Sequence, residues 1–347
     1  MARLTLFFVL AALLAYCAGL AAAASYSNPV LVPNSPDPGV VHYNGRYYAV
    51  TTTNGAGELF PIHVSSDLVN WKHIGYVFPA KSHTKPHWAV SDFWAPELHI
   101  VKGVIRVYFV ARDTTGLLCV GVATSTSSSP LGPYKDLGHP LVRNETIGSI
   151  DPTLYQHEVQ SVDADGRVTS RTELLLYWKS DGNAIGKPTI IWVQPLTDDG
   201  LALAPHTQQK ELLRNDLHWE GICMHRAGWY YLFYSGNMYD SHGPDGTCLY
   251  SVGVARSASP TGPFVKRGDP ILHASLPNRF TGPGHCSVVP FRTASGEESW
   301  YMVYHAWSVG AIAGGNPRHM LTDKVEWAHG WPSVYKGYPS YTEQPTP

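Results

Sequence analysis

Three carboxylic acids of this 347-residue chain occupy positions from which they could cooperate in acid–base chemistry. Asp37, Asp151 and Glu220 each open a short apolar segment, and Trp94 and His285 open two further segments of the same kind. In chain order the series is Asp37, Trp94, Asp151, Glu220 and His285, with spacings of 57, 57, 69 and 65 residues. Taken singly, the two Asp-Pro pairs would be ordinary turn starters, and the glutamate would be a surface residue. Their equivalent places in a repeated pattern instead predict one site, in which paired carboxylates act as general acid and general base.

An aromatic-rich strand pattern recurs five times and predicts the elements that position these residues. Each copy follows a turn and then alternates in hydrophobicity, as expected for a strand with one buried face. The copies are residues 45–51, 104–110, 173–178, 228–234 and 299–305, at a period of roughly 55 to 70 residues. This period is close to, and somewhat longer than, that of known propeller blades.

A second repeat supports the same architecture. Residues 122–134 and 254–264 both run from a strand through a Pro/Gly turn to an aromatic residue. Long helical periodicity is absent, and the 32 Gly and 27 Pro suit turn-dense β structure. We therefore predict an all-β fold, a five-bladed β-propeller, with residues 25–347 as a single domain. A β-sandwich is the alternative, but it would not repeat at this period.

The chain resembles glycoside hydrolase family 43, the group of arabinanases, arabinofuranosidases and β-xylosidases. The motifs that carry the resemblance are Asp37-Pro38, Trp94-Ala95-Pro96-Glu97, Ile150-Asp151-Pro152-Thr153, Glu220-Gly221, residues 230–236 and Gly282-Pro283-Gly284-His285. The resemblance covers nearly all of residues 25–347 and implies a propeller that hydrolyses glycosidic bonds with inversion.

The resemblance also implies a role for each reactive residue. Asp37 would be the general base, Glu220 the general acid, and Asp151 the residue that tunes and orients the acid. His285 would lie in the channel, where many relatives hold a calcium ion; a hydrogen-bonded structural histidine is the alternative. No organic cofactor is expected. Ile222 and Cys286 depart from the family pattern beside Glu220 and His285, but neither change removes a catalytic group.

Aromatic residues near the second segment are candidates for binding a carbohydrate. Phe93, Trp94 and Trp88 are predicted to form an apolar wall, since flat rings stack on the C–H faces of sugars. Arg318 either reaches a substrate hydroxyl or lies on the surface. Arabinofuranosyl or xylosyl linkages are the expected substrates, with a galactan-type glycosidase as the alternative. A non-catalytic carbohydrate-binding propeller would need no acid and base, and a retaining enzyme would need a nucleophilic carboxylate close to the acid.

Residues 1–24 are predicted to be a secretory signal peptide. Arg3 precedes an apolar run over residues 4–20, and small residues follow at 21–24. An uncleaved anchor is the alternative. We expect the mature protein to be extracellular, monomeric and free of the membrane. The net charge of -2 gives no reason to expect a nucleic-acid partner.

An extracellular location would favour two covalent modifications. Four cysteines follow the predicted signal, and in an oxidising compartment they could form two disulfides, with three connectivities open. They are Cys119, Cys223, Cys248 and Cys286. Asn144 opens the one clear N-glycosylation sequence, Asn144-Glu145-Thr146.

Overall fold

The computed structural model describes residues 24–32, 34–53, 57–163, 165–215, 219–226, 228–293 and 295–347. The side chains of residues 215 and 219–226 lie outside this description. So do residues 1–23, which carry nearly all of the predicted signal peptide, and that prediction stays untested. No helix in the described part is long and apolar enough to cross a membrane.

Twenty strands of the described chain form five antiparallel sheets, each built from four strands that are consecutive in the sequence. The first sheet contains β2 (Gly39–Tyr43), β3 (Arg46–Val50), β4 (Leu59–Ser65) and β5 (Lys72–Phe78). The second contains β6 (Ala89–Val101), β7 (Val104–Asp113), β8 (Leu118–Ser125) and β9 (Tyr134–Asp136). The third contains β10 (Ser149–Val162), β11 (Val168–Ser180), β12 (Thr189–Pro195) and β13 (Lys210–Asn215).

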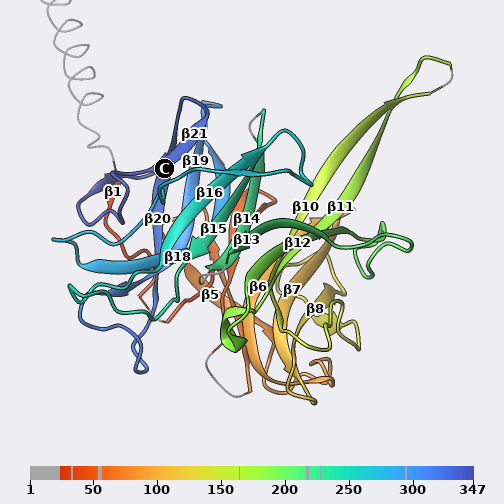
Figure 1. Ribbon diagram of the computed structural model, residues 1–347, viewed down its shortest axis with the longest axis horizontal. Coiled ribbons are helices and arrows are strands. Elements are labelled where there is room, and N and C mark those ends of the chain that lie inside the picture. Colours follow the sequence, from red (N-terminus) through yellow and green to blue (C-terminus); the bar gives the residue numbers. More distant parts are fainter. Residues whose placement is uncertain are drawn as a thin grey trace, which may run out of the picture.

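The remaining two sheets follow the same order. The fourth contains β14 (Trp219–Arg226), β15 (Tyr230–Gly236), β16 (Ser251–Ser257) and β17 (Val265–Lys266). The fifth contains β18 (Phe280–Arg292), β19 (Glu298–Ser308), β20 (His319–Ala328) and β21 (Trp331–Val334). The first strands of the five sheets contact one another in a ring, and the sheets succeed each other around it (Figure 1). The predicted five-bladed propeller is confirmed, and the sandwich alternative is wrong.

The ring is closed by segments from both ends of the described chain. β1 (Ser25–Tyr26) pairs with β22 (Gln344–Pro345). The backbone N–H of Val30 then donates to the carbonyl of Met320 on β20 at 2.9 Å. On the inner side, Ser287 of β18 donates its hydroxyl to Pro38 at 2.9 Å and accepts the N–H of Val40 at 3.0 Å. These bonds hold the first blade against the fifth.

The aromatic repeat copies lie in the second strand of each blade, and neighbouring blades cover both of their faces. On β15, Tyr231 and Phe233 pack toward the fifth blade against Tyr304. Leu232 and Tyr234, on the other face of β15, pack toward the third blade. The sequence pattern predicted only one buried face. Both faces are buried because each sheet is enclosed between two others. The hydroxyl of Tyr231 donates to the carbonyl of Gly330, and that of Tyr304 donates to the carboxylate of Asp323.

A β-bulge lies near the start of the inner strand in four of the blades, beginning with the second. A bulge inserts one extra residue and re-aims a side chain. Asp151 and His285 occupy such positions with φ of 54° and 41°, and Asp37, just before β2, has φ of 55°. In the second blade Asp92 and Ala95 have this conformation, at 57° and 43°, and Trp94 between them does not. Left-handed backbone is therefore shared by Asp37, Asp151 and His285, which line the cavity, but not by Trp94.

The described cysteines restrict the predicted disulfides. Cys119 is a free, buried thiol on β8. Burial, and to a smaller extent the charge of Asp113, raise the pKa of Cys119 to about 12. With Cys119 free, four cysteines cannot form two bridges, so that expectation is wrong. Cys248 and Cys286 are buried as well, and the side chain of Cys223 lies outside the described part.

Candidate active site

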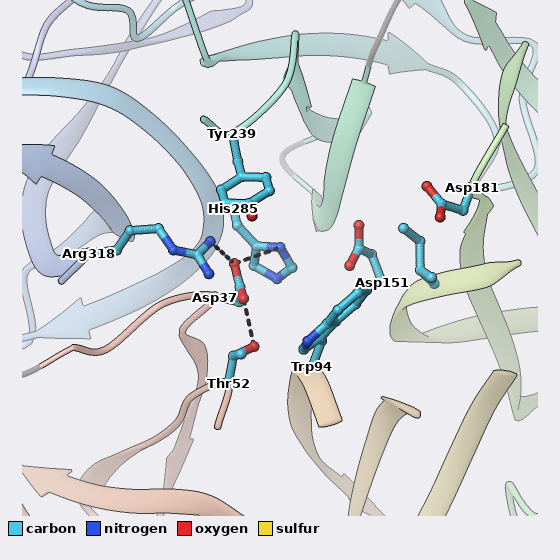
Figure 2. Close-up of a pocket in the computed structure, with 9 residues that line it drawn as sticks. Asp37, Thr52, Trp94, Asp151, Asp181, Tyr239, His285 and Arg318 are labelled. Atoms are coloured by element: carbon cyan, nitrogen blue, oxygen red, sulfur yellow. Dashed lines mark hydrogen bonds and ion pairs between the residues drawn. The ribbon is translucent and has the colours of Figure 1, made fainter. Parts of the chain in front are cut away.

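A cavity of about 410 Å³ lies where the starts of the inner strands converge. Residues of the first, second, third and fifth blades line this cavity. From the fourth blade the lining residue is Tyr239, in the loop that follows β15. The lining residues are Asp37, Thr52, Trp94, Ile150, Asp151, Asp181, Tyr239, His285 and Arg318. Figure 2 shows Asp37 and Arg318 on one side of this cavity and Asp151 and Asp181 on the other, with Trp94 below Asp151.

Asp37 is a buried carboxylate whose two oxygens have different partners. Its Oδ2 accepts the hydroxyl of Thr52 at 2.6 Å, and its Oδ1 lies 3.1 Å from Nη1 of Arg318 (Figure 2). Thr52 is itself fixed, because its Oγ1 accepts the N–H of Ala95 at 2.8 Å. Burial alone would raise the pKa of Asp37, but Arg318 and the neighbouring histidines outweigh burial and hold it well below its ordinary value. Asp37 is therefore ionised throughout the neutral range.

Two stacked histidines of the fifth blade, His285 and His305, contact Asp37. Nδ1 of His305 accepts the backbone N–H of Asp37 at 3.1 Å, so this nitrogen carries no proton. Burial, and to a smaller extent the charge of Arg318, lower the pKa of His305 to about 4, which keeps the ring neutral. Nδ1 of His285 lies 3.8 Å from Oδ1 of Asp37, and the backbone N–H of His285 donates to Ser235 at 2.8 Å. The pair fixes the backbone and the rotamer of Asp37.

Asp151 pairs with a buried lysine on the opposite side of the cavity. Its Oδ2 lies 3.2 Å from Nζ of Lys179, whose side chain is 1% exposed. Glu97 is buried nearby, and its Oε1 has no hydrogen-bond partner in the described part of the chain. Burial raises the pKa of Glu97 well above its ordinary value, and the charge of Asp151 raises it further. Burial therefore favours the neutral form of Glu97, and Asp151 with Lys179 forms the ion pair of this side.

Glu220 lies near the start of β14, the inner strand between β10 and β18. Its backbone pairs with Ser235 on β15, and the bulge of this blade falls between Glu220 and Ile222. The backbone of Glu220 thus occupies the region of the inner strand that carries Asp151 and His285 in the neighbouring blades. Its side chain lies outside the described part, so its role remains a prediction.

The four predicted binding residues lie in different surroundings. Trp94 lines the cavity. Phe93 packs against Phe60 at 6.1 Å between ring centroids and lines a neighbouring cavity of about 550 Å³. Trp88 donates its indole N–H to Asp136 at 3.2 Å and stacks on a core phenylalanine, so it lines neither cavity. Arg318 lies in the cavity, where it contacts Asp37 and covers the ring of Tyr239 at 4.9 Å.

Several cavity residues were not found by sequence reasoning. Thr52 and Asp181 follow the second strands of their blades, β3 and β11, and Tyr239 follows β15. A usable signal existed, because the second strand runs antiparallel to the inner strand and must end where the inner strand begins. Polar or aromatic residues just after each aromatic repeat copy were therefore candidates for the same mouth.

The residues around His285 offer little to a metal ion. In the described part of the chain no three His, Cys, Asp or Glu side chains come together in a group that could hold one. Calcium takes six to eight oxygen ligands, whereas His285 offers an imidazole nitrogen. The described side chains alone therefore do not fit a calcium ion, and the predicted calcium remains a hypothesis that metal analysis of the purified protein would test.

Comparison with known proteins identifies the family of the chain. The sequence profile described as Glycosyl hydrolases family 43 matches residues 26–332. The chain belongs to glycoside hydrolase family 43. It is therefore a glycoside hydrolase, as predicted, and the non-catalytic binding propeller is excluded.

Individual family 43 relatives are similar over most of the chain. Arabinan endo-1,5-alpha-L-arabinosidase C of Emericella nidulans is 27% identical, over 90% of this chain and 96% of its own. The arabinoxylan arabinofuranohydrolase of Bacillus subtilis is 27% identical, over 83% of this chain and 59% of its own. A crystal structure of a thermostable family-43 glycoside hydrolase has a TM-score of 0.75 and 29% identity, covering 93% of this chain and 99% of the other.

The charge next to Asp37 predicts how this family 43 enzyme responds to pH. Arg318→Met removes the cation that favours ionised Asp37, so the pKa of Asp37 should rise. Activity requires the ionised form if Asp37 is the base, and the acidic limb of kcat/KM against pH should then move to higher pH. Arg318→Lys keeps the charge and should move the limb less. An acidic limb that stays in place in the Met variant would contradict this account of Asp37.

Proposed function

We propose that the chain is a secreted, inverting glycosidase that acts on α-L-arabinofuranosyl or β-xylosyl linkages. The observation that carries the proposal is the buried, ionised Asp37 on one side of a cavity whose other side holds the Asp151–Lys179 pair. Hydrolysis with inversion needs a carboxylate that activates water on one face of the sugar. It also needs a carboxylic acid on the opposite face, about 6.5–9.5 Å away, to protonate the leaving oxygen.

Asp37 suits the part of the base. A base that activates water must be ionised at the working pH, and Arg318 stabilises the ionised form. Thr52 bonds the carboxylate of Asp37 and His305 bonds its backbone N–H, and neither bond needs substrate. The carboxylate still lines the cavity, so a water molecule between it and the sugar can give up its proton to Asp37.

Glu220 is the proposed acid, since β14 neighbours the strand that carries Asp151. An acid must hold its proton near neutral pH. A negative Asp151 close to Glu220 would raise the pKa of Glu220 by disfavouring a second charge. Lys179 balances the charge of Asp151 without removing it. Asp151 would then act as a tuning and orienting residue.

The sugar at the reaction centre would rest on Trp94, whose ring borders the cavity between its two sides. The named activities of the fungal and bacterial relatives, an arabinanase and an arabinofuranohydrolase, support arabinofuranosyl linkages as the first substrate to try. Secretion is proposed on the pattern of residues 1–24, and N-terminal sequencing of the exported protein would check cleavage after Ala24.

A substrate screen tests the proposal. Nitrophenyl α-L-arabinofuranoside, β-xyloside and β-galactoside should be compared with arabinan, arabinoxylan and galactan as polymers. We expect turnover of arabinofuranosyl or xylosyl substrates, with Asp37→Asn as the inactive control. Turnover of galactosyl substrates alone would replace this substrate class with the galactan-type alternative.

A further inference from the structure

A second acidic residue, Asp181, lines the cavity beside Asp151. It directly follows β11, and Figure 2 shows its carboxylate on the side of Asp151 away from Asp37. Within the described chain the carboxylate of Asp181 makes no hydrogen bond and no ion pair, unlike the carboxylates of Asp37 and Asp151. Polar groups that are partly removed from water usually have a partner. A carboxylate with open acceptor positions in a cavity is suited to a ligand that brings hydroxyl donors.

The backbone around Asp181 is held independently of its side chain. Its N–H donates to the carbonyl of Gly148 at 2.8 Å, as the N–H of Thr52 does to Pro36 in the first blade. At the next residue, Gly182, a Cβ would collide with the backbone carbonyl of Pro188. The loop therefore fixes the backbone from which the carboxylate projects before any ligand arrives, and this lowers the entropic cost of binding.

The charges facing Asp181 come from three strands or their ends. Burial raises the pKa of Asp181; Lys179 lowers it, Asp151 raises it and Arg112 lowers it. Arg112 of β7 also pairs with Asp92 of β6. The two cations keep an acidic side chain acceptable here although Asp151 is close. No described residue makes a hydrogen bond or ion pair with the carboxylate of Asp181, which is therefore available to the cavity.

The stereochemistry of an inverting reaction places the carboxylate of Asp181 on the side of the leaving group. Water attacks from the side of Asp37, and in an inverting reaction the leaving group departs on the opposite side. That is the side of Asp151, of the proposed acid on β14, and of Asp181. We propose that Asp181 binds hydroxyl groups of the leaving-group sugar and so makes the enzyme select a second sugar over other leaving groups. This inference rests on the proposed inverting function.

Leaving-group dependence is the measurement that tests this role. Asp181→Ala should lower kcat/KM on an arabino- or xylo-oligosaccharide by about 10- to 100-fold, the range for one lost hydrogen bond to a charged group. The same variant should stay within about twofold of the unmutated enzyme on the matching nitrophenyl glycoside, because the aryl group has no sugar hydroxyls. Asp181→Asn keeps a hydrogen-bond acceptor without the charge, and its kcat/KM on the oligosaccharide should fall between those of the Ala variant and the unmutated enzyme. Asp165→Ala, at the tip of the β10–β11 hairpin, is the matched control and should change neither rate.

Two outcomes would overturn the inference while leaving the proposed function in place. An equal loss on both substrates, with a shifted alkaline limb of the pH profile, would make Asp181 an electrostatic partner of Asp151 and the acid. Unchanged rates on both substrates would remove it from the site altogether. If the unmutated enzyme cleaves neither substrate class, the proposed function fails first and takes this inference with it.

Discussion

Asp37→Asn should lower kcat/KM by about 10²- to 10⁴-fold on every glycoside that the enzyme cleaves, the usual contribution of a positioned general base. The loss should not depend on the leaving group, because water must be activated whichever group departs. The substitution keeps the shape of the side chain, and the amide oxygen can still accept from Thr52 and Arg318. Rates on a natural oligosaccharide and on a nitrophenyl glycoside provide the comparison.

A chemical rescue separates this role from a structural one. In Asp37→Ala, azide can enter in place of the activated water and attack without a base, giving a glycosyl azide of inverted configuration. Circular dichroism and the unfolding temperature should match those of the unmutated protein. Activity of the Asn variant within tenfold of the unmutated enzyme would show that Asp37 is not the base.

Glu220→Gln should produce a loss that depends strongly on the leaving group. Cleavage of natural glycosides should fall by about 10²- to 10⁴-fold, because their leaving oxygen needs a proton. A dinitrophenyl glycoside, whose leaving group departs as a stable anion, should lose less than about tenfold. The alkaline limb of the pH profile should also disappear, since that limb reports deprotonation of the acid.

The same variant also distinguishes the two classes of mechanism. Azide added to Glu220→Gln should give no glycosyl azide of retained configuration, because an inverting enzyme forms no covalent intermediate. Equal losses on both substrates would contradict Glu220 as the acid. Attention would then turn to Asp181 and Glu97, the other carboxyl groups on that side of the site.

Much of the architecture could be predicted because the blades repeat. Five aromatic copies gave five second strands, and their spacing placed Asp37, Asp151 and His285 at one mouth. Antiparallel order within a blade then follows from short turns. The exact opening position was harder to predict. In the second blade Asp92 and Ala95, and not Trp94, have the left-handed backbone, and at Ala95 a φ angle of this kind leaves no mark in the sequence.

The side-chain environment could not be read from residue type. Trp88 was predicted to contact the sugar because it is aromatic, but its ring stacks on Phe109 and its N–H donates to Asp136. Arg318 was predicted to bind substrate or lie on the surface; it lines the cavity, and the sequence did not indicate its ion pair with Asp37. Both differences depend on contacts between residues far apart in the chain. Periodicity along one segment carries no information on such contacts.

The configuration of the first product tests the central claim most directly. ¹H NMR within the first minutes of hydrolysis, before mutarotation, identifies the anomer released from the substrate that the screen selects. An inverting mechanism predicts β-arabinofuranose from an α-L-arabinofuranoside, or α-xylose from a β-xyloside. A product with the configuration of the substrate would contradict the account and would make Asp37 a nucleophile instead of a base.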